Sequence, residues 1–204
     1  MIAIVDYGMG NLKSVFNAFK KVAPNLKIVI TSNPDIINSA DRIVFPGQGA
    51  MPDCLRELEK KNLTQVITHA SKNKPFLGIC IGMQMLNNFS EEGLIDCLGV
   101  IPGSVKKFKP NNHYNKVPHM GWNQVRRNKD HFLWNGITNN ERFYFVHSYY
   151  VKPSDKNLIA ANTLYESPFC SAINKDNIFA VQFHPEKSSL PGLQLLKNFT
   201  KWKI

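Results

Sequence analysis

The chain has 204 residues, 43% hydrophobic and 20% charged, which predicts one globular domain spanning residues 1–204. No apolar run approaches the ~20 residues of a membrane span, and apolar strand residues begin at once, so the sequence predicts a cytoplasmic protein without membrane contact. The net charge is +10, but the basic residues come as scattered pairs without interleaved aromatic side chains, which argues against nucleic-acid binding.

The first eighty residues alternate short apolar runs with amphipathic stretches. Asn11 is placed to cap a helix whose positions Leu12, Val15 and Phe19 fall on one face. Leucines and isoleucines between residues 55 and 67 indicate further helical segments. Strands are predicted at residues 2–6, 27–31, 42–45 and 76–79. This repetition predicts an α/β fold with right-handed crossovers and a parallel sheet.

The second half contains short β-like pieces that follow one another without long helices between them. Ser188, Ser189 and Pro191 then open a last helix, with Leu196 and Phe199 on its inner face together with Leu193. Residues 110–118 are polar and predict a loop. The β-like pieces lie at residues 105–108, 124–126, 143–147, 158–162, 169–174 and 178–183. We therefore expect a mostly parallel central sheet that is extended by antiparallel strands.

One pentapeptide, Gly78-Ile79-Cys80-Ile81-Gly82, stands between a predicted strand and a helix-like stretch. A nucleophile flanked by small residues at this junction is the pattern of a nucleophile elbow. The helix start favours the thiolate form of Cys80, which is the form that attacks carbonyl carbon. The sequence therefore predicts that Cys80 forms a thioester with a carbonyl substrate.

An imidazole and a carboxylate follow about a hundred residues later, in His184-Pro185-Glu186. Both come directly after a strongly apolar predicted strand. A Cys-His-acid triad needs a base that takes the thiol proton and a carboxylate that holds the imidazole. We expect His184 to be the general base and then the general acid, and Glu186 to orient it.

Two backbone segments are candidates for stabilising an oxyanion. The elbow supplies one N–H group, that of Ile81. The second is expected from Gly47-Gln48-Gly49, which follows a predicted strand at the edge where ligands bind in open α/β sheets. Composition alone would favour a simple turn here.

Metal and cofactor sites are not predicted. The cysteines Cys54, Cys80, Cys97 and Cys170 show neither paired nor metal-binding spacing, and apart from Cys80 they read as small buried side chains. Gly8 and Gly10 follow the first strand, but Lys13 stands where a dinucleotide-binding motif has its third glycine. The remaining histidines also lack the spacing of metal ligands: His69, His113, His119, His131 and His147. Of these, His119 and His147 lie among aromatic residues.

These residues together resemble a known family. The elbow with Met83 and Gln84, combined with His184-Pro185-Glu186, looks like the class I (triad) glutamine amidotransferases. Residues 6–12, 116–123 and 144–149 narrow the likeness to the glutaminase subunits of imidazole glycerol phosphate synthase, and the likeness runs from the first strand to the last helix.

The resemblance implies a three-layer, flavodoxin-like fold and a defined reaction. Glutamine would be hydrolysed at Cys80, and the ammonia would pass to a (β/α)8-barrel synthase subunit, the other half of a heterodimer in histidine biosynthesis. The resemblance implies no cofactor and no metal. It assigns residues 47–49 to a mobile oxyanion strand, Gln84, His147, Ser148 and Tyr149 to glutamine binding, and Asn11 and Trp122 to the partner surface.

One position departs from the family pattern, and other functions share the elbow. Many members carry a small apolar residue where this chain has Gln48, whose longer side chain could change how readily the loop flips. Cysteine peptidases and non-catalytic sensor proteins use a similar fold. A closer alternative is a glutaminase of the same type that feeds a different synthase, for example one that makes amidino sugars.

Overall fold

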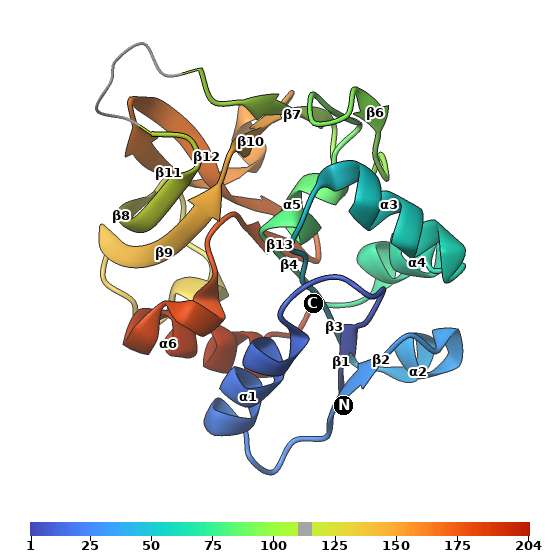
Figure 1. The fold of residues 1–204 in the computed structure, drawn as a ribbon. Coiled ribbons are helices and arrows are strands. Elements are labelled where there is room, and N and C mark those ends of the chain that lie inside the picture. The colour runs from blue at the N-terminus through green and yellow to red at the C-terminus, as the bar shows by residue number, and fades with distance from the viewer. Residues whose placement is uncertain (110–115) are drawn as a thin grey trace.

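The computed structural model describes residues 1–109 and 116–204, so most of the predicted loop 110–118, including His113, lies outside the described residues. Its centre is a five-stranded parallel sheet (Figure 1). The strands are β1 (Ile2–Val5), β2 (Ile28–Thr31), β3 (Arg42–Phe45), β4 (Phe76–Ile79) and β13 (Ile178–Val181), in the order β2-β1-β3-β4-β13. All residues of β1, β4 and β13 are buried, as expected for parallel strands covered on both faces.

Helices cover both faces of this sheet and make three layers (Figure 1). On one face, α1 (Leu12–Val22) packs against α6 (Ser189–Lys201). On the other lie α2 (Pro34–Ser39), α3 (Met51–Lys60) and α4 (Thr64–Asn73). The stripe of apolar side chains predicted for α1 is real: Val15 and Phe19 are buried, and the Asn11 side chain accepts a hydrogen bond from the Ser14 N–H.

Antiparallel strands extend the sheet beyond β13, as predicted. β12 (Ser167–Lys175), β10 (Tyr149–Pro153) and β7 (Gly103–Lys107) follow β13 in that order. β5 (Phe89–Ser90), which pairs parallel with β7, and β6 (Ile95–Asp96) end this edge. A branch leaves β12 through β11 (Ile159–Tyr165) to the hairpin of β8 (His119–Arg127) and β9 (Glu141–His147). The short helix α5 (Ile81–Met85) and three 3₁₀ turns complete the described elements. The turns are η1 (Phe132–Trp134), η2 (Lys156–Leu158) and η3 (Pro185–Lys187).

The structure differs from the sequence-based expectations in a few elements. Helix α2 was not predicted, although Asn33 caps it and Pro34 is its first residue. Strand β10 was missed because it follows β9 after a single residue. The strand predicted at 178–183 ends at Val181, so Gln182 and Phe183 lie outside it. Leu193 of α6 is only partly buried, whereas Leu196 and Phe199 are buried.

Candidate active site

The junction of β4 with α5 (Ile81–Met85) has the geometry of a nucleophile elbow. Cys80 adopts φ 55° and ψ −111°, a left-handed conformation that costs an L-residue about 1–2 kcal/mol. A Cβ added at Gly82 would lie 1.8 Å from the Phe45 carbonyl oxygen, and one at Gly78 would lie 3.1 Å from the Ala180 Cβ. Close packing against β3 and β13 therefore requires glycine at Gly82 and leaves little room at Gly78, and it holds Cys80 in its strained conformation.

His184 and Glu186 follow β13, the strand that pairs with β4. The His184 Nδ1 lies 2.8 Å from Glu186 Oε1, and their side chains are only 6% and 2% exposed. The backbone N–H of His184 donates to the Tyr144 carbonyl, and this hydrogen bond fixes the backbone of the turn. Nδ1 donates to the carboxylate, so Nε2 is the free nitrogen, and it has no hydrogen-bond partner among the described residues.

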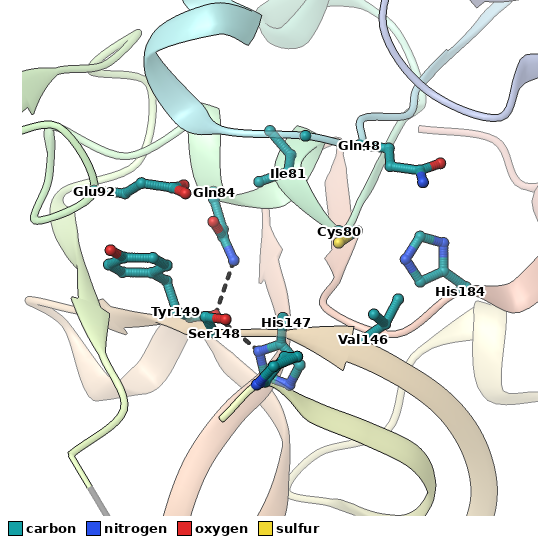
Figure 2. A pocket seen from close by; sticks show the side chains of 12 residues that line it. Gln48, Cys80, Ile81, Gln84, Glu92, Val146, His147, Ser148, Tyr149 and His184 are labelled. Carbon is teal, nitrogen blue, oxygen red and sulfur yellow. Dashed lines mark hydrogen bonds between the residues drawn. The ribbon is translucent and has the colours of Figure 1, made fainter. Parts of the chain in front are cut away.

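The imidazole and the sulfur face each other across the pocket (Figure 2). Burial of His184 opposes its charged form, but the negative charge of a Cys80 thiolate and the Glu186 carboxylate outweigh burial and raise the pKa of His184. The site thus favours a protonated imidazole facing the Cys80 sulfur. A thiolate can attack carbonyl carbon, and an imidazolium can protonate a leaving nitrogen.

A pocket of about 270 Å³ opens above the Cys80 sulfur. It brings together nine of the residues that the sequence singled out and three that it did not. Glu186 lies behind His184 rather than in the wall. The lining residues are Gln48, Gly49, Cys80, Ile81, Gln84, Glu92, Pro118, Val146, His147, Ser148, Tyr149 and His184.

The wall opposite the elbow is held by hydrogen bonds. Gln84 Nε2 donates to the Tyr149 carbonyl at 3.0 Å, and His147 Nδ1 donates to the same oxygen at 2.7 Å (Figure 2). Burial lowers the pKa of His147 to about 3, so this ring is neutral. The buried Gln84 Oε1 has no hydrogen-bond partner among the described residues and is available to a ligand.

Residues 47–49 lie against the elbow. A Cβ at Gly47 would come within 2.6 Å of the Tyr7 hydroxyl oxygen and 2.8 Å of the Ile81 Cβ, and Gly49 has φ 115°, so glycine suits both positions. The exposed Gln48 side chain lines the pocket on the side of His184 (Figure 2). The first N–H groups of α5, beginning with that of Ile81, have no acceptor within their own helix. The N–H of Ile81 is therefore a backbone donor beside Cys80 that a ligand can use.

Glu92 is the main residue that sequence reasoning missed. Its carboxylate accepts a hydrogen bond from the Met51 N–H at 3.0 Å, at the start of α3, and it lies at one end of the pocket (Figure 2). Partial burial raises its pKa. In the sequence Glu92 stands only beside Glu91 and Gly93, which reads as an ordinary turn. Pro118 and Val146 were also missed, although both adjoin residues that the sequence singled out.

Asn11 and Trp122 do not line the pocket. Asn11 is exposed and caps α1, a local role that needs no partner protein. Trp122 is 49% exposed on β8, where it packs edge-on against Tyr144, and Met120 beside it on the same face of the strand is 62% exposed.

The described residues contain no helix long and apolar enough to cross a membrane and no group of three His, Cys, Asp or Glu side chains suited to a metal ion. Cys54 and Cys170 are buried, as the sequence indicated, whereas Cys97 is partly exposed. Of the histidines considered as ligands, His119 and His147 lie together, and their rings contact each other and neighbouring aromatic side chains rather than a metal site.

Comparison with known proteins identifies relatives over the whole chain. The family model described as "Glutamine amidotransferase class-I" matches residues 3–202. Two relatives named "Imidazole glycerol phosphate synthase subunit HisH" are 56% identical (Nitrosospira multiformis; 99% of this chain, 98% of that one) and 52% identical (Acinetobacter baylyi; 100% and 98%).

Solved structures share the fold at much lower identity. A chain described as "Crystal structure of glutamine amidotransferase" superimposes with a TM-score of 0.72 at 15% identity, covering 98% of this chain and all of that one. The glutaminase domain of a Trypanosoma brucei protein, with bound acivicin, gives a TM-score of 0.62 at 17% identity, covering all of this chain and 94% of that one.

Proposed function

Because the chain belongs to the class I glutamine amidotransferase family, we propose that it is the glutaminase subunit of an imidazole glycerol phosphate synthase. It would hydrolyse L-glutamine to glutamate and supply the ammonia to histidine biosynthesis. The observation that carries this proposal is the meeting of the Cys80 sulfur and the Glu186-held His184 ring in one pocket. The names of the relatives favour this synthase over one that makes amidino sugars.

The chemistry follows from the positions of three side chains. The Cys80 thiolate attacks the carboxamide carbon, and the oxygen that becomes negative is stabilised by the N–H of Ile81 and a second N–H from residues 47–49. His184 gives its Nε2 proton to the nitrogen, the C–N bond breaks, and ammonia leaves a thioester on Cys80. His184 then removes a proton from water, which attacks the thioester and releases glutamate. Glu186 holds the ring throughout.

The remainder of the pocket suits the amino-acid end of glutamine. The Glu92 carboxylate at one end is a partner for the α-ammonium group. The free Gln84 Oε1 accepts a further N–H of the substrate, and His147 fixes the Tyr149 carbonyl beside it. Ser148 and Tyr149 line the same wall. Glu92 is our addition to the binding residues that the family resemblance implies.

The released ammonia sets a requirement that one chain cannot meet. In neutral water it becomes ammonium, which is not a nucleophile, so a sealed path to the acceptor is needed. We propose that a (β/α)8-barrel synthase subunit supplies this path in a cytoplasmic heterodimer, where a reactive thiol stays reduced. Trp122, with the exposed Met120 beside it, is the apolar surface that this partner would cover, and the exposed Asn11 is the further contact that the family resemblance implies.

Replacing the nucleophile tests the proposal. In the complex, Cys80→Ala should lower the glutamine-dependent rate by at least about 10⁴-fold and leave the rate with added ammonium salt unchanged. His184→Ala should also be severe. Cys97→Ala is the matched control, because this thiol lies outside the pocket. Loss of both activities in Cys80→Ala would show that Cys80 has a structural role, and full glutamine-dependent activity would refute the proposal.

A further inference from the structure

Gln182 is fully buried at the end of β13 and does not line the pocket, yet its side chain contacts the nucleophile. Its Nε2 lies 3.7 Å from the Cys80 sulfur, within hydrogen-bond range for sulfur. Its Oε1 accepts a hydrogen bond from Gln84 Nε2 at 2.9 Å. The reaction described above uses Cys80 and Gln84 but gives no role to the amide that joins them.

The direction of these hydrogen bonds can be derived from one backbone carbonyl. The Tyr149 oxygen can only accept, so the Gln84 atom 3.0 Å away must be its nitrogen. The same nitrogen then faces Gln182, which must present its oxygen there. The other end of the Gln182 amide, its NH₂ group, consequently points at the sulfur. Turning either amide over would set donor against donor or acceptor against acceptor.

The Tyr149 carbonyl is itself held by a second chain of oriented bonds. His147 donates to it from Nδ1, so the neutral ring accepts at Nε2 from His119 Nδ1, 2.8 Å away. His119 Nε2 accepts in turn from Asn123 Nδ2 at 3.2 Å, and Asn123 also donates to the Leu164 carbonyl. Burial lowers the pKa of His119 to about 4, and that of His147 is lowered as well. At neutral pH each ring therefore carries a proton on one nitrogen only, and the order of donors and acceptors is kept. A continuous network thus runs from β8 to the sulfur.

We propose that Gln182 is a positioning residue that donates its side-chain N–H to the Cys80 thiolate and holds the sulfur toward the pocket. A hydrogen bond to an ionised group is stronger than one to a neutral group, so the contact favours the thiolate over the thiol. Its Oε1 at the same time keeps the Gln84 oxygen turned toward a ligand. The geometry is a property of the free chain, and only its effect on turnover rests on the proposed glutaminase function.

Alkylation of Cys80 by iodoacetamide, followed across pH by peptide mass spectrometry, tests this without any enzyme assay. In Gln182→Met the midpoint of the pH–rate profile should rise by about one unit, because the donor is lost. Gln182→Glu keeps the acceptor for Gln84 but sets a carboxylate beside the sulfur, so its midpoint should rise further. Ser171→Ala is the control. The Ser171 backbone carbonyl accepts from the backbone N–H of Gln182, and the Ser171 hydroxyl has no partner among the described residues. The midpoint should therefore not move in this variant.

A measurement on the unmutated chain covers the case in which these variants do not fold. In a sample with ¹⁵N-labelled glutamine side chains, one amide NH₂ signal should titrate with the midpoint found by alkylation, and this titration should vanish in Cys80→Ala. Unchanged alkylation midpoints in folded Gln182 variants, or the absence of a titrating signal, would overturn the proposal. Absence of glutaminase activity in the unmutated complex, with the Cys80 titration as expected, would instead count against the proposed function.

Discussion

The two walls of the pocket are held in place by different forces. The wall that carries Cys80 is positioned by close packing: Gly82 lies directly under the Phe45 carbonyl, and Gly78 lies close against Ala180. The wall of β9 and β10 is positioned by hydrogen bonds among buried neutral groups, centred on the Tyr149 carbonyl. The packed wall has no space for an added side-chain atom at Gly82. The geometry of the other wall depends on which group donates and which accepts in each hydrogen bond. Their sensitivities to substitution should therefore differ in kind as well as in size.

The largest effect is expected in the packed wall. Gly82→Ala should lower the free energy of unfolding by more than about 3 kcal/mol, because its Cβ would meet a backbone carbonyl that cannot move without β3. This loss should exceed the gain of about 1 kcal/mol that alanine brings to a helix. Urea unfolding would measure it. Gly78→Ala is the graded control, with an expected loss of about 1 kcal/mol, and an equal loss in both variants would contradict the packing argument.

A smaller effect is expected where the packed wall meets the imidazole. Glu186→Gln should lower kcat of the complex by about 10²-fold and leave KM for glutamine unchanged, because the amide oxygen still accepts from Nδ1 but carries no charge. The pKa of His184 should fall, since one of the charges that raise it is removed. Steady-state kinetics and NMR of the histidine ring would measure both. Glu57→Gln, on the surface of α3, should alter neither, and an unmoved His184 signal in Glu186→Gln would contradict the assigned contact.

The smallest effect is expected in the hydrogen-bonded wall. His119→Gln should cost about 1 kcal/mol at neutral pH, because one bond to His147 is lost. Burial lowers the pKa of His119 to about 4, so between pH 6.5 and 4 the unfolded chain binds a proton that the folded chain does not, and stability falls as the pH falls. In His119→Gln this decline should be shallower by up to about 1.4 kcal/mol per pH unit. Urea unfolding at several pH values would measure this difference, with His69→Gln at an exposed position as control. If the free energy of unfolding of His119→Gln and of the unmutated chain fell with pH in parallel, the result would count against a neutral buried His119.

The sequence predicted the packed wall better than the other one. Glycines around Cys80, an apolar strand before it and His184 after another strand are local patterns with one structural solution. Gln84, His147, Ser148 and Tyr149 were assigned only through resemblance to a family. Their arrangement depends on the pairing of β9 with β8 and of β10 with β7 and β12, which no local pattern specifies. Glu92 was missed for the same reason: the α3 N-terminus that it contacts is brought to it by the fold.

The fold shows the same division. Parallel strands buried on both faces are continuous apolar runs, so β1, β3 and β4 were placed closely. In contrast, β10 is separated from β9 only by Ser148 and ends in Pro153, and β5 and β6 have two residues each, too few to form a pattern. The position of β12 between β13 and β10 is set by long-range pairing.

Because the backbone at Cys80 is left-handed, the reactivity of its thiol indicates whether the central strands have assembled. A chain that had not yet joined β3, β4 and β13 would relax this residue to negative φ, and the sulfur would swing away from the imidazole. Newly made or partly unfolded molecules would then carry an ordinary cysteine and be chemically silent toward the amide. Reactivity is in this way withheld until the central strands have come together.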